Sequence, residues 1–426
     1  MIQSFGKVVL CTIAALGLAS AASAAPYSPS GASSETVVVH RQAKADRTIA
    51  LQPAEAGRTV VLTSRGRSAQ PAQPKKKTWK PASRMAHILP MQTEEEEGTL
   101  IFSDSPEYVT QDGILYQDTV SGPARVFYYH LNSQDTDKKV AVILEAQEDY
   151  TEVTITRGGI GEPSTDYLHT GKGAQMNYFG NRRFDHLYMM KGSTRLLDPQ
   201  MDQIVLAPQQ LICGIYDFKT NHPVKVTVIL YPADADPCEF WKNADIQPKD
   251  DMRLRGTYAG MNRKLTAAEG YDPDTDGIVY VPLADNVHDL YQTGIDATDG
   301  SAVTDFGNYG INYDVHIPLK GDRPVEVYLC PLGGIYAGAM TVRLGARGRE
   351  DLMPTPFGRG FFGDATPPEP DNIQKARDEG VWILPQTAEL AYLGTYKAGD
   401  DPYFLFSPPG ASNLPVALVL IPALHS

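Results

Sequence analysis

Three alternating aspartates are the residues best spaced to do chemistry, in the stretch YDPDTDGIVY at 271–280. With one backbone carbonyl they form a set of candidate calcium ligands: Asp272, Asp274, Asp276 and Ile278. Calcium prefers several oxygen ligands, and Gly277 allows the tight turn that such a loop needs. An EF-hand would also need a bidentate glutamate at the twelfth position, where Leu283 stands. The motif therefore predicts a simpler structural calcium turn at the head of a strand, and the alternative is a plain Asp–Gly turn.

The chain around this motif is acidic. Between Lys264 and Lys320 it has ten acidic residues and no lysine or arginine. Such a cluster on a compact domain is costly unless it is solvated or paired with a cation. The surroundings therefore favour structural Ca²⁺ as the one candidate cofactor, with a solvated acidic loop as the alternative.

Tyrosines are the second group of candidate binding residues, and the chain has 22 of them. Those proposed for binding lie in or near predicted strands: Tyr309, Tyr313 and Tyr336. On an exposed sandwich face their rings could stack on sugar rings. Alternating tyrosines in strands also serve as core residues or cross-strand pairs, and both interpretations remain open.

Motifs for nucleophilic or zinc-dependent catalysis are missing. The sequence has no G-x-S-x-G, no H-E-x-x-H and no cysteine in a protease-like context. The glycine-rich stretch 158–174 lacks the spacing of a phosphate-binding loop, so we predict a β-hairpin loop there. Its polar residues could line a site: Asp166, Tyr167, His169 and Lys172. A glycoside hydrolase needs only two carboxylates about 5–10 Å apart, so a chain with 51 acids leaves that activity open.

Short β-prone runs separated by polar breaks make up most of the chain after Thr99. KKVAVILEA at 138–146 is one such run, and few helical periods interrupt the series. The pattern predicts an all-β protein with two tandem β-sandwich domains, Ig-like or jelly-roll-like, at 98–236 and 250–426. The one short helix that we predict lies at 370–380.

The two predicted domains resemble each other. FYYHLNSQDTDKKVAVILEA at 127–146 is similar to NYDVHIPLKGDRPVEVYLCPL at 312–332, since a strand carrying His130 or His316 leads through a polar turn into an apolar strand. The endings PVKVTVILYPA and PVALVLIPA also match. We therefore expect two copies of one structural unit.

Several blocks resemble a group of secreted bacterial proteins, some of which are labelled after the copper amine oxidase N-terminal domain: SDSPEYVTQDGILYQDTV, GNYGINYDVHIPL, PLGGIYAGA and FSPPGASNLPVALVLIP. The resemblance covers most of residues 99–426 and implies an extracytoplasmic β-rich protein without an established activity. The small module that gives the label is not recognisable in this chain. Copper amine oxidases form their quinone in a T-x-x-N-Y-D/E stretch, but Tyr309 stands in place of the threonine and the nine histidines form no H-x-H pair. No oxidase activity is predicted.

The N-terminal part predicts export. Lys7 precedes an apolar run at 8–18 that is too short to span a bilayer, and Ala-Ser-Ala at 22–24 fits a cleavage site, so residues 1–24 form a signal peptide. Residues 25–97 lack an apolar period and are predicted to be a disordered basic linker, or stalk. The whole chain has a net charge of −13, so the part after this basic linker is strongly acidic and would repel nucleic acid. We predict a secreted or cell-surface protein without a membrane span.

Three cysteines follow the signal peptide: Cys213, Cys238 and Cys330. One bridge between Cys213 and Cys238 is possible, and we favour three buried thiols. Taken together, the sequence predicts a non-catalytic structural or binding protein of the cell envelope or extracellular space. Its candidate partners are cell-wall or extracellular polysaccharide, or another surface protein. The alternatives are an extracellular carbohydrate-active enzyme and an assembly subunit or inhibitor of another exported protein.

Overall fold

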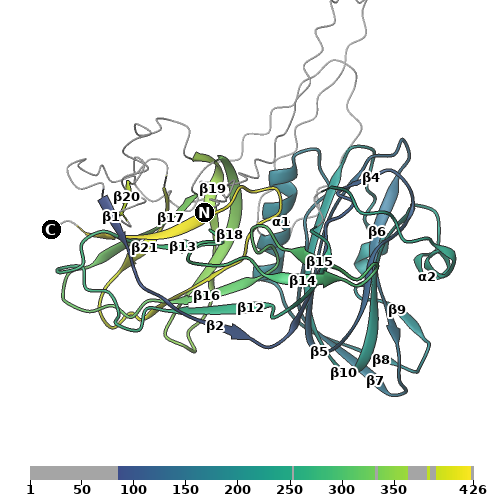
Figure 1. The fold of residues 1–426 in the computed structure, drawn as a ribbon, viewed down its shortest axis with the longest axis horizontal. Coiled ribbons are helices and arrows are strands. Elements are labelled where there is room, and N and C mark those ends of the chain that lie inside the picture. Colours follow the sequence, from purple (N-terminus) through teal and green to yellow (C-terminus); the bar gives the residue numbers. More distant parts are fainter. Residues whose placement is uncertain (1–84, 252–253, 332–333, 363–380, 384–389, 424–426) are drawn as a thin grey trace, which may run out of the picture. The chain divides into compact units, whose positions relative to one another are not determined.

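The computed structural model describes residues 85–251, 254–331, 334–362, 381–383 and 390–423 (Figure 1). All of them belong to one compact unit, Lys76–Ser426. The predicted signal peptide, most of the predicted linker and the predicted helix at 370–380 lie outside the described residues.

The prediction of an all-β fold is confirmed. Strands dominate the described residues, and the α-helices among them are α1 (Tyr167–Gly180) and the short α2 (Pro237–Phe240). Two 3₁₀ turns, Pro199–Gln203 and Trp241–Asn243, accompany them. No helix in the described part is long and apolar enough to cross a membrane.

The first repeat is built on a large sheet with two very long strands. One of them is β10 (Leu211–Pro232). Its end, Val224–Pro232, pairs with β6 (Lys138–Ala146), whereas its earlier part pairs with β7 (Thr151–Ile160). The register of β10 against β5 shifts between Thr220 and Val224, where the strand passes from one pairing to the other. The strands of this sheet are β3 (Thr99–Ser103), β4 (Tyr108–Val109), β5 (Gly113–Asn132), β6 (Lys138–Ala146), β7 (Thr151–Ile160), β8 (Arg182–Met189), β9 (Thr194–Leu196), β10 (Leu211–Pro232), β11 (Gly256–Ala259), β14 (Thr293–Asp296) and β15 (Ser301–Thr304).

One buried cluster fills the first repeat. It joins Val142 of β6 and Val226 of β10 to Val153 of β7 and Tyr216 of β10, although β6 and β7 do not pair. The two halves of the sheet therefore face each other across a shared core, as in a sandwich.

The second repeat is made of two six-stranded sheets. Val281 and Leu418 of one sheet share a core with Val315 and Phe404 of the other, so these sheets also face each other. The first sheet contains, in order, β20 (Val381–Ile383), β1 (Met85–Ile88), β13 (Val279–Leu283), β23 (Val416–Pro422), β17 (Val325–Pro331) and β21 (Ala391–Tyr396). The second contains, in order, β19 (Asp351–Phe362), β18 (Gly334–Leu344), β22 (Pro402–Phe406), β16 (Asn312–His316), β12 (Asn262–Thr266) and β2 (Gln92–Glu96).

Several strand pairings of the two repeats correspond. β17 pairs with β23 as β6 pairs with the end of β10, and β18 pairs with β22 as β7 pairs with its beginning. β12 runs parallel to β16 as β3 runs parallel to β5. The two histidines of the repeated motif also correspond, since His130 lies opposite Ile212 and His316 opposite Tyr403. This common pairing supports the internal repeat inferred from the sequence.

The repeats exchange strands. β11, which precedes the second repeat, pairs with β3 of the first. Conversely, β2, which precedes the first repeat, pairs with β12 of the second (Figure 1). Likewise β1 pairs with β13, and Ile246 bridges to Ile114. The predicted linker therefore ends too late, because residues from Met85 onward already belong to strands. The boundary predicted between 236 and 250 is crossed by strand pairing in both directions.

Helix α1 corrects the β-hairpin loop predicted at 158–174. The Asp166 side chain accepts a hydrogen bond from the His169 backbone N–H and begins the helix. Glycines inside the helix lower its intrinsic propensity, but they allow close packing. A Cβ atom on Gly171 would lie 2.0 Å from the Gly410 carbonyl oxygen. The helix is therefore stabilised by its contacts with β7, β10 and β18 rather than by its sequence.

A buried arginine joins the two repeats. Arg125 of β5 forms a bidentate ion pair with Asp217, at 2.6 and 2.9 Å. Its Nη1 also donates to the carbonyls of Met261 and Gly310, at 2.5 and 2.8 Å. Because all of these partners are held by one buried side chain, the contact ties β5 to the chain around β12 and β16.

Candidate functional site

The antiparallel strand pair β7–β8, whose two strands are connected through α1, carries a group of large exposed side chains. β8 pairs only with β7 and so lies at an edge of its sheet. Side chains alternate between the two faces of a strand. The inward face of β8 includes Leu187 and Met189, which pack on the core of the first repeat, and the outward face carries Phe184, His186 and Tyr188.

The outward side chains are large and well exposed. Tyr150, which precedes β7, is 79% exposed, and Phe184 and Tyr188 are 76% and 71% exposed. Met190 follows β8 and is half exposed. Scattered single apolar residues are normal on a protein surface, but a group on one pair of strands is typical of a binding surface. We call Tyr150, Phe184, His186, Tyr188 and Met190 the aromatic face.

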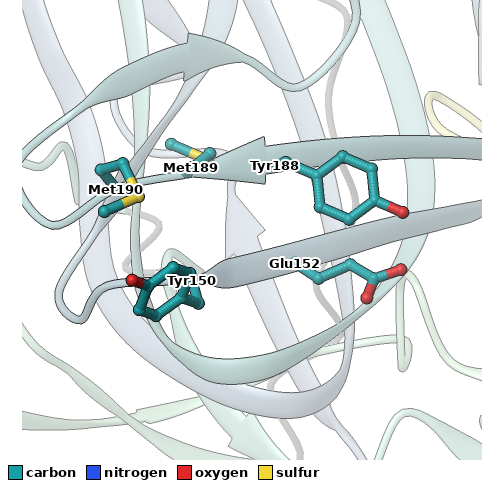
Figure 2. Close-up of a pocket in the computed structure, with 5 residues that line it drawn as sticks. All are labelled: Tyr150, Glu152, Tyr188, Met189 and Met190. Atoms are coloured by element: carbon teal, nitrogen blue, oxygen red, sulfur yellow. The ribbon is translucent and has the colours of Figure 1, made fainter.

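A cavity of about 440 Å³ lies at the end of this face. Its lining residues come from β7, β8 and the residues next to their ends: Tyr150, Glu152, Tyr188, Met189 and Met190 (Figure 2). Figure 2 shows the Tyr188 ring beside Glu152 of the neighbouring strand and the Tyr150 ring beside Met190. The volume falls within the range of small-molecule sites, about 300–1,000 Å³.

Polar contacts fix the orientation of the face. Glu152 lies directly opposite Tyr188 in the strand register. Its Oε1 is 2.9 Å from His186 Nδ1, which is also 3.2 Å from the Thr154 hydroxyl. The His186 and Tyr188 rings are nearly parallel, at 14°, with centroids 6.3 Å apart. The His186 and Tyr188 rings therefore lie side by side along β8.

The predicted calcium turn is a closed network of hydrogen bonds in the structure. The Asp272 backbone N–H donates to Asp276 Oδ2 at 2.8 Å, and the Asp274 N–H donates to Asp272 Oδ1 at 3.0 Å. Gly277 has φ +65°, and its carbonyl accepts from the Tyr271 hydroxyl at 2.6 Å. The Ile278 side chain is buried. Within the described ranges, no group of three or more His, Cys, Asp or Glu is placed to hold a metal ion. Calcium binding at this turn stays a prediction.

The tyrosines proposed for sugar stacking are buried, which corrects their assignment to an exposed face. Tyr313 and Tyr336 have no exposed surface, and Tyr309 is 8% exposed. All three belong to the core of the second repeat. Tyr309 donates to the Ser412 carbonyl and Tyr313 to the Asp289 carboxylate. A sugar ring cannot stack on them, because protein atoms already cover their faces.

The remaining predicted residues do not converge on a site. Of the polar set in the glycine-rich stretch, Asp166 caps helix α1 and Lys172 donates to the Pro356 carbonyl at 2.7 Å. Cys213 and Cys238 are free thiols, so the bridge considered between them is not formed. Cys213 is buried, as predicted for a thiol in the core, whereas Cys238 is partly exposed.

A buried Ser–His pair resembles a catalytic dyad but lacks access. Ser103 Oγ lies 2.8 Å from His130 Nε2, and His130 Nδ1 lies 2.9 Å from the Pro106 carbonyl. Burial lowers the pKa of His130 to about 4. Ser103 and His130 have no exposed surface, so no substrate can reach them in this structure. The pair orders the loop after β3.

A group of carboxyl side chains surrounds the same loop. Asp250 accepts hydrogen bonds from the Ser105 hydroxyl and the Glu107 backbone N–H, both at 2.8 Å. Burial and the neighbouring Asp250 charge raise the pKa of Glu107 to about 7. Burial, together with the charges of Glu107, Asp250 and Asp305, raises the pKa of Asp104 well above its ordinary value. The buried Oδ1 of Asp104 has no hydrogen-bond partner among the described residues. Burial and the like charges nearby therefore favour the protonated forms of Asp104 and Glu107.

Comparisons with known proteins add no candidate function. No protein-family model matches the chain, and no curated protein matches it. The resemblance noted from the sequence blocks therefore stays a prediction, and the functional argument rests on the geometry of the chain itself.

Sequence reasoning missed the aromatic face, although its signal is present. In RRFDHLYM at 182–189, Phe184, His186 and Tyr188 alternate with residues of mixed character. Alternation of ring-bearing residues is typical of a strand with one exposed apolar face. The alternate residues Asp185, Leu187 and Met189 do not form a uniform apolar series, which hid the period.

Proposed function

We propose that this protein is a secreted, non-catalytic binding protein of the cell envelope or extracellular space, and that its aromatic face binds polysaccharide. The observation that carries the proposal is the group of exposed rings on the β7–β8 strand pair, with Tyr150, Phe184 and Tyr188 each more than two-thirds exposed. The resemblance of the chain to secreted bacterial proteins supports the location.

The chemistry of the face suits a sugar ligand. Tyrosine and phenylalanine rings offer flat apolar surfaces, and the apolar faces of sugar rings pack well on them. The His186 and Tyr188 rings lie side by side, so an extended chain can contact more than one ring at once. Glu152 and His186 add polar groups beside the rings, which can hydrogen-bond sugar hydroxyls. A rigid sheet edge that displays these groups needs little rearrangement on binding.

The test is a binding measurement on purified polysaccharides and on insoluble wall preparations. The protein should be retained, and a soluble oligosaccharide of a retained polymer should compete. Tyr188→Ala should weaken binding about two- to tenfold, since a stacked ring is worth roughly 0.5–1.5 kcal/mol. Because the Tyr188 ring is exposed, the melting temperature should change little.

Tyr108→Ala is the matched control. Tyr108 is also a tyrosine with a largely exposed ring, at 55%, but it lies on β4, outside the aromatic face. Its removal should leave retention unchanged. Equal losses in both variants, or retention that does not depend on Tyr188, would contradict the proposed surface. Absence of binding to any glycan would remove the polysaccharide proposal itself.

A carbohydrate-active enzyme is the second candidate, because of the carboxyl group near Glu107. A general acid in glycoside hydrolysis must be protonated near neutral pH. The pKa of Glu107 is raised to about 7, which meets that requirement, and its side chain is partly exposed. Reducing ends that accumulate with time, and that disappear in Glu107→Gln, would favour this activity over simple binding.

A further inference from the structure

We propose that the cavity at the end of the aromatic face binds a cationic group, and that the favoured ligand is a glycan of unacetylated amino sugars. This inference rests on the proposed function, because it assigns the ligand class of the same surface. It goes further by stating which charge the ligand carries.

The lining of the cavity has the composition of a cation site. The Tyr188 ring lies beside Glu152 at one end of the space, and the Tyr150 ring lies beside Met190 at the other end (Figure 2). Aromatic faces attract ammonium groups through the negative charge above the ring. Met189 and Met190 complete the lining with polarizable thioethers. Glu152 is the only charged residue that lines the cavity, and it is negative.

Glu152 keeps an oxygen for the ligand. Its Oε1 is close to His186 Nδ1, at 2.9 Å. The carboxylate is 39% exposed, and a carboxylate accepts several hydrogen bonds through its two oxygens. An ammonium group over the Tyr188 ring could therefore reach Glu152 without displacing His186. A carboxylate or sulfate on a ligand would meet this negative charge and be repelled.

Charges around the β7–β8 strand pair also favour a cation. The basic side chains next to Phe184 face acids, since Arg183 pairs with Asp185 and Asp198, and Arg182 pairs with Glu350. Where β7 begins and β8 ends, Glu148 pairs with His222, and the Asp149 carboxylate accepts from the Lys191 backbone N–H. The basic groups there that oppose a cation are the Lys191 side chain and the imidazoles of His186 and His222. The net charge of −13 on the whole chain adds a long-range attraction for polycations.

The experiment compares two ligands with the same backbone. A soluble hexamer of β-1,4-linked glucosamine carries ammonium groups at pH 6, whereas the N-acetylated hexamer carries none. We expect the amino form to bind about tenfold more tightly in calorimetry. Glu152→Gln should remove most of this preference. Tyr188→Ala should weaken both ligands.

Two controls separate the cavity from general electrostatics. Glu269→Gln removes one negative charge from an exposed position outside the β7–β8 strand pair and should leave the preference for the amino form intact. A thermal melt of Glu152→Gln checks that the protein stays folded when the contact between Glu152 and His186 is lost. A preference for the amino form that persists in both Glu152→Gln and Tyr188→Ala would overturn the inference, because only long-range attraction would then remain.

The outcomes also separate this inference from the proposed function. Equal affinity for the two hexamers, lost in Tyr188→Ala, would overturn the cation inference and leave glycan binding in place. Failure of both hexamers and of all other polysaccharides would overturn both. Tight binding of the amino hexamer that needs both Glu152 and Tyr188 is the result we expect.

Discussion

Glu107→Gln should stabilise the protein at alkaline pH and leave its stability unchanged in acid. Glu107 lies in the loop after β3, where its backbone N–H donates to Asp250. Burial and the Asp250 charge raise its pKa from 4.5 to about 7. The folded protein therefore binds a proton at Glu107 more tightly than the unfolded chain does.

The sign and size of the effect follow from this difference. A carboxyl with a raised pKa contributes stability below pH 4.5, and this contribution is lost as the pH rises through about 7. One pKa unit corresponds to about 1.4 kcal/mol, so the full loss at pH 8 is about 3 kcal/mol. Glutamine has nearly the same shape and no charge to desolvate. The variant should therefore melt about 5 °C above the wild type at pH 8, and at the same temperature near pH 4.

The assay is thermal unfolding of both proteins in matched buffers between pH 4 and 8. Glu269→Gln, an exposed site outside the carboxyl group, is the control and should follow the wild type at every pH. A difference of the same size at pH 4 and pH 8 would refute the reasoning, since it would show an effect of shape rather than of charge. No difference at pH 8 would show that the Glu107 carboxylate is well solvated.

Other changes test the packing and the calcium turn. Arg125→Met should cost about 3–5 kcal/mol in denaturant unfolding, because it leaves Asp217 buried without its partner. Gly171→Ala should lower the melting temperature, since its Cβ would meet the Gly410 carbonyl at 2.0 Å, whereas Gly173→Ala in the same helix meets nothing closer than 3.5 Å and should stabilise by about 0.5–1 kcal/mol. Added Ca²⁺ should raise the melting temperature and EDTA lower it, and Asp274→Ala should abolish this response. An unchanged response in that variant would leave only a hydrogen-bonded turn at this position.

Local sequence patterns predicted most strands but not how far they continue. GILYQDTV and ARVFYYHLN suggest two strands, because Gly122 and Pro123 interrupt the apolar pattern. In the structure β5 runs through both residues and bends there, as β10 does at its register shift. A bend and a break have the same local sequence, and only the pairing partners distinguish them.

Helix α1 shows a different limit. Its glycines and the absence of an apolar stripe indicate a loop when local propensity is considered alone. The helix forms because Gly171 and its neighbours let it approach β7, β18 and the chain at Gly410. Such contacts between distant segments are not encoded in any local pattern.

The candidate site followed the same division. Tyr313 lies in the strongly patterned strand β16, and Tyr309 lies in the turn just before it. Strong patterning of this kind is itself a sign of burial. Phe184 and Tyr188 lie on an edge strand with a weak pattern, and there the rings are exposed. For surface recognition, aromatic residues in weakly apolar strands are therefore better candidates than those in the core strands.

Strand exchange explains why the repeat is clear in sequence while its boundaries are not. Each repeat needs a partner strand from outside its own segment, because β3 is completed by β11 and β12 by β2. Cutting the chain between 236 and 250 would leave the inner edge of β3 unpaired and remove β2 from β12. The buried Arg125 crosses the same junction through the Met261 and Gly310 carbonyls. The two repeats therefore stabilise each other, and the unit that folds is the pair rather than either sandwich alone.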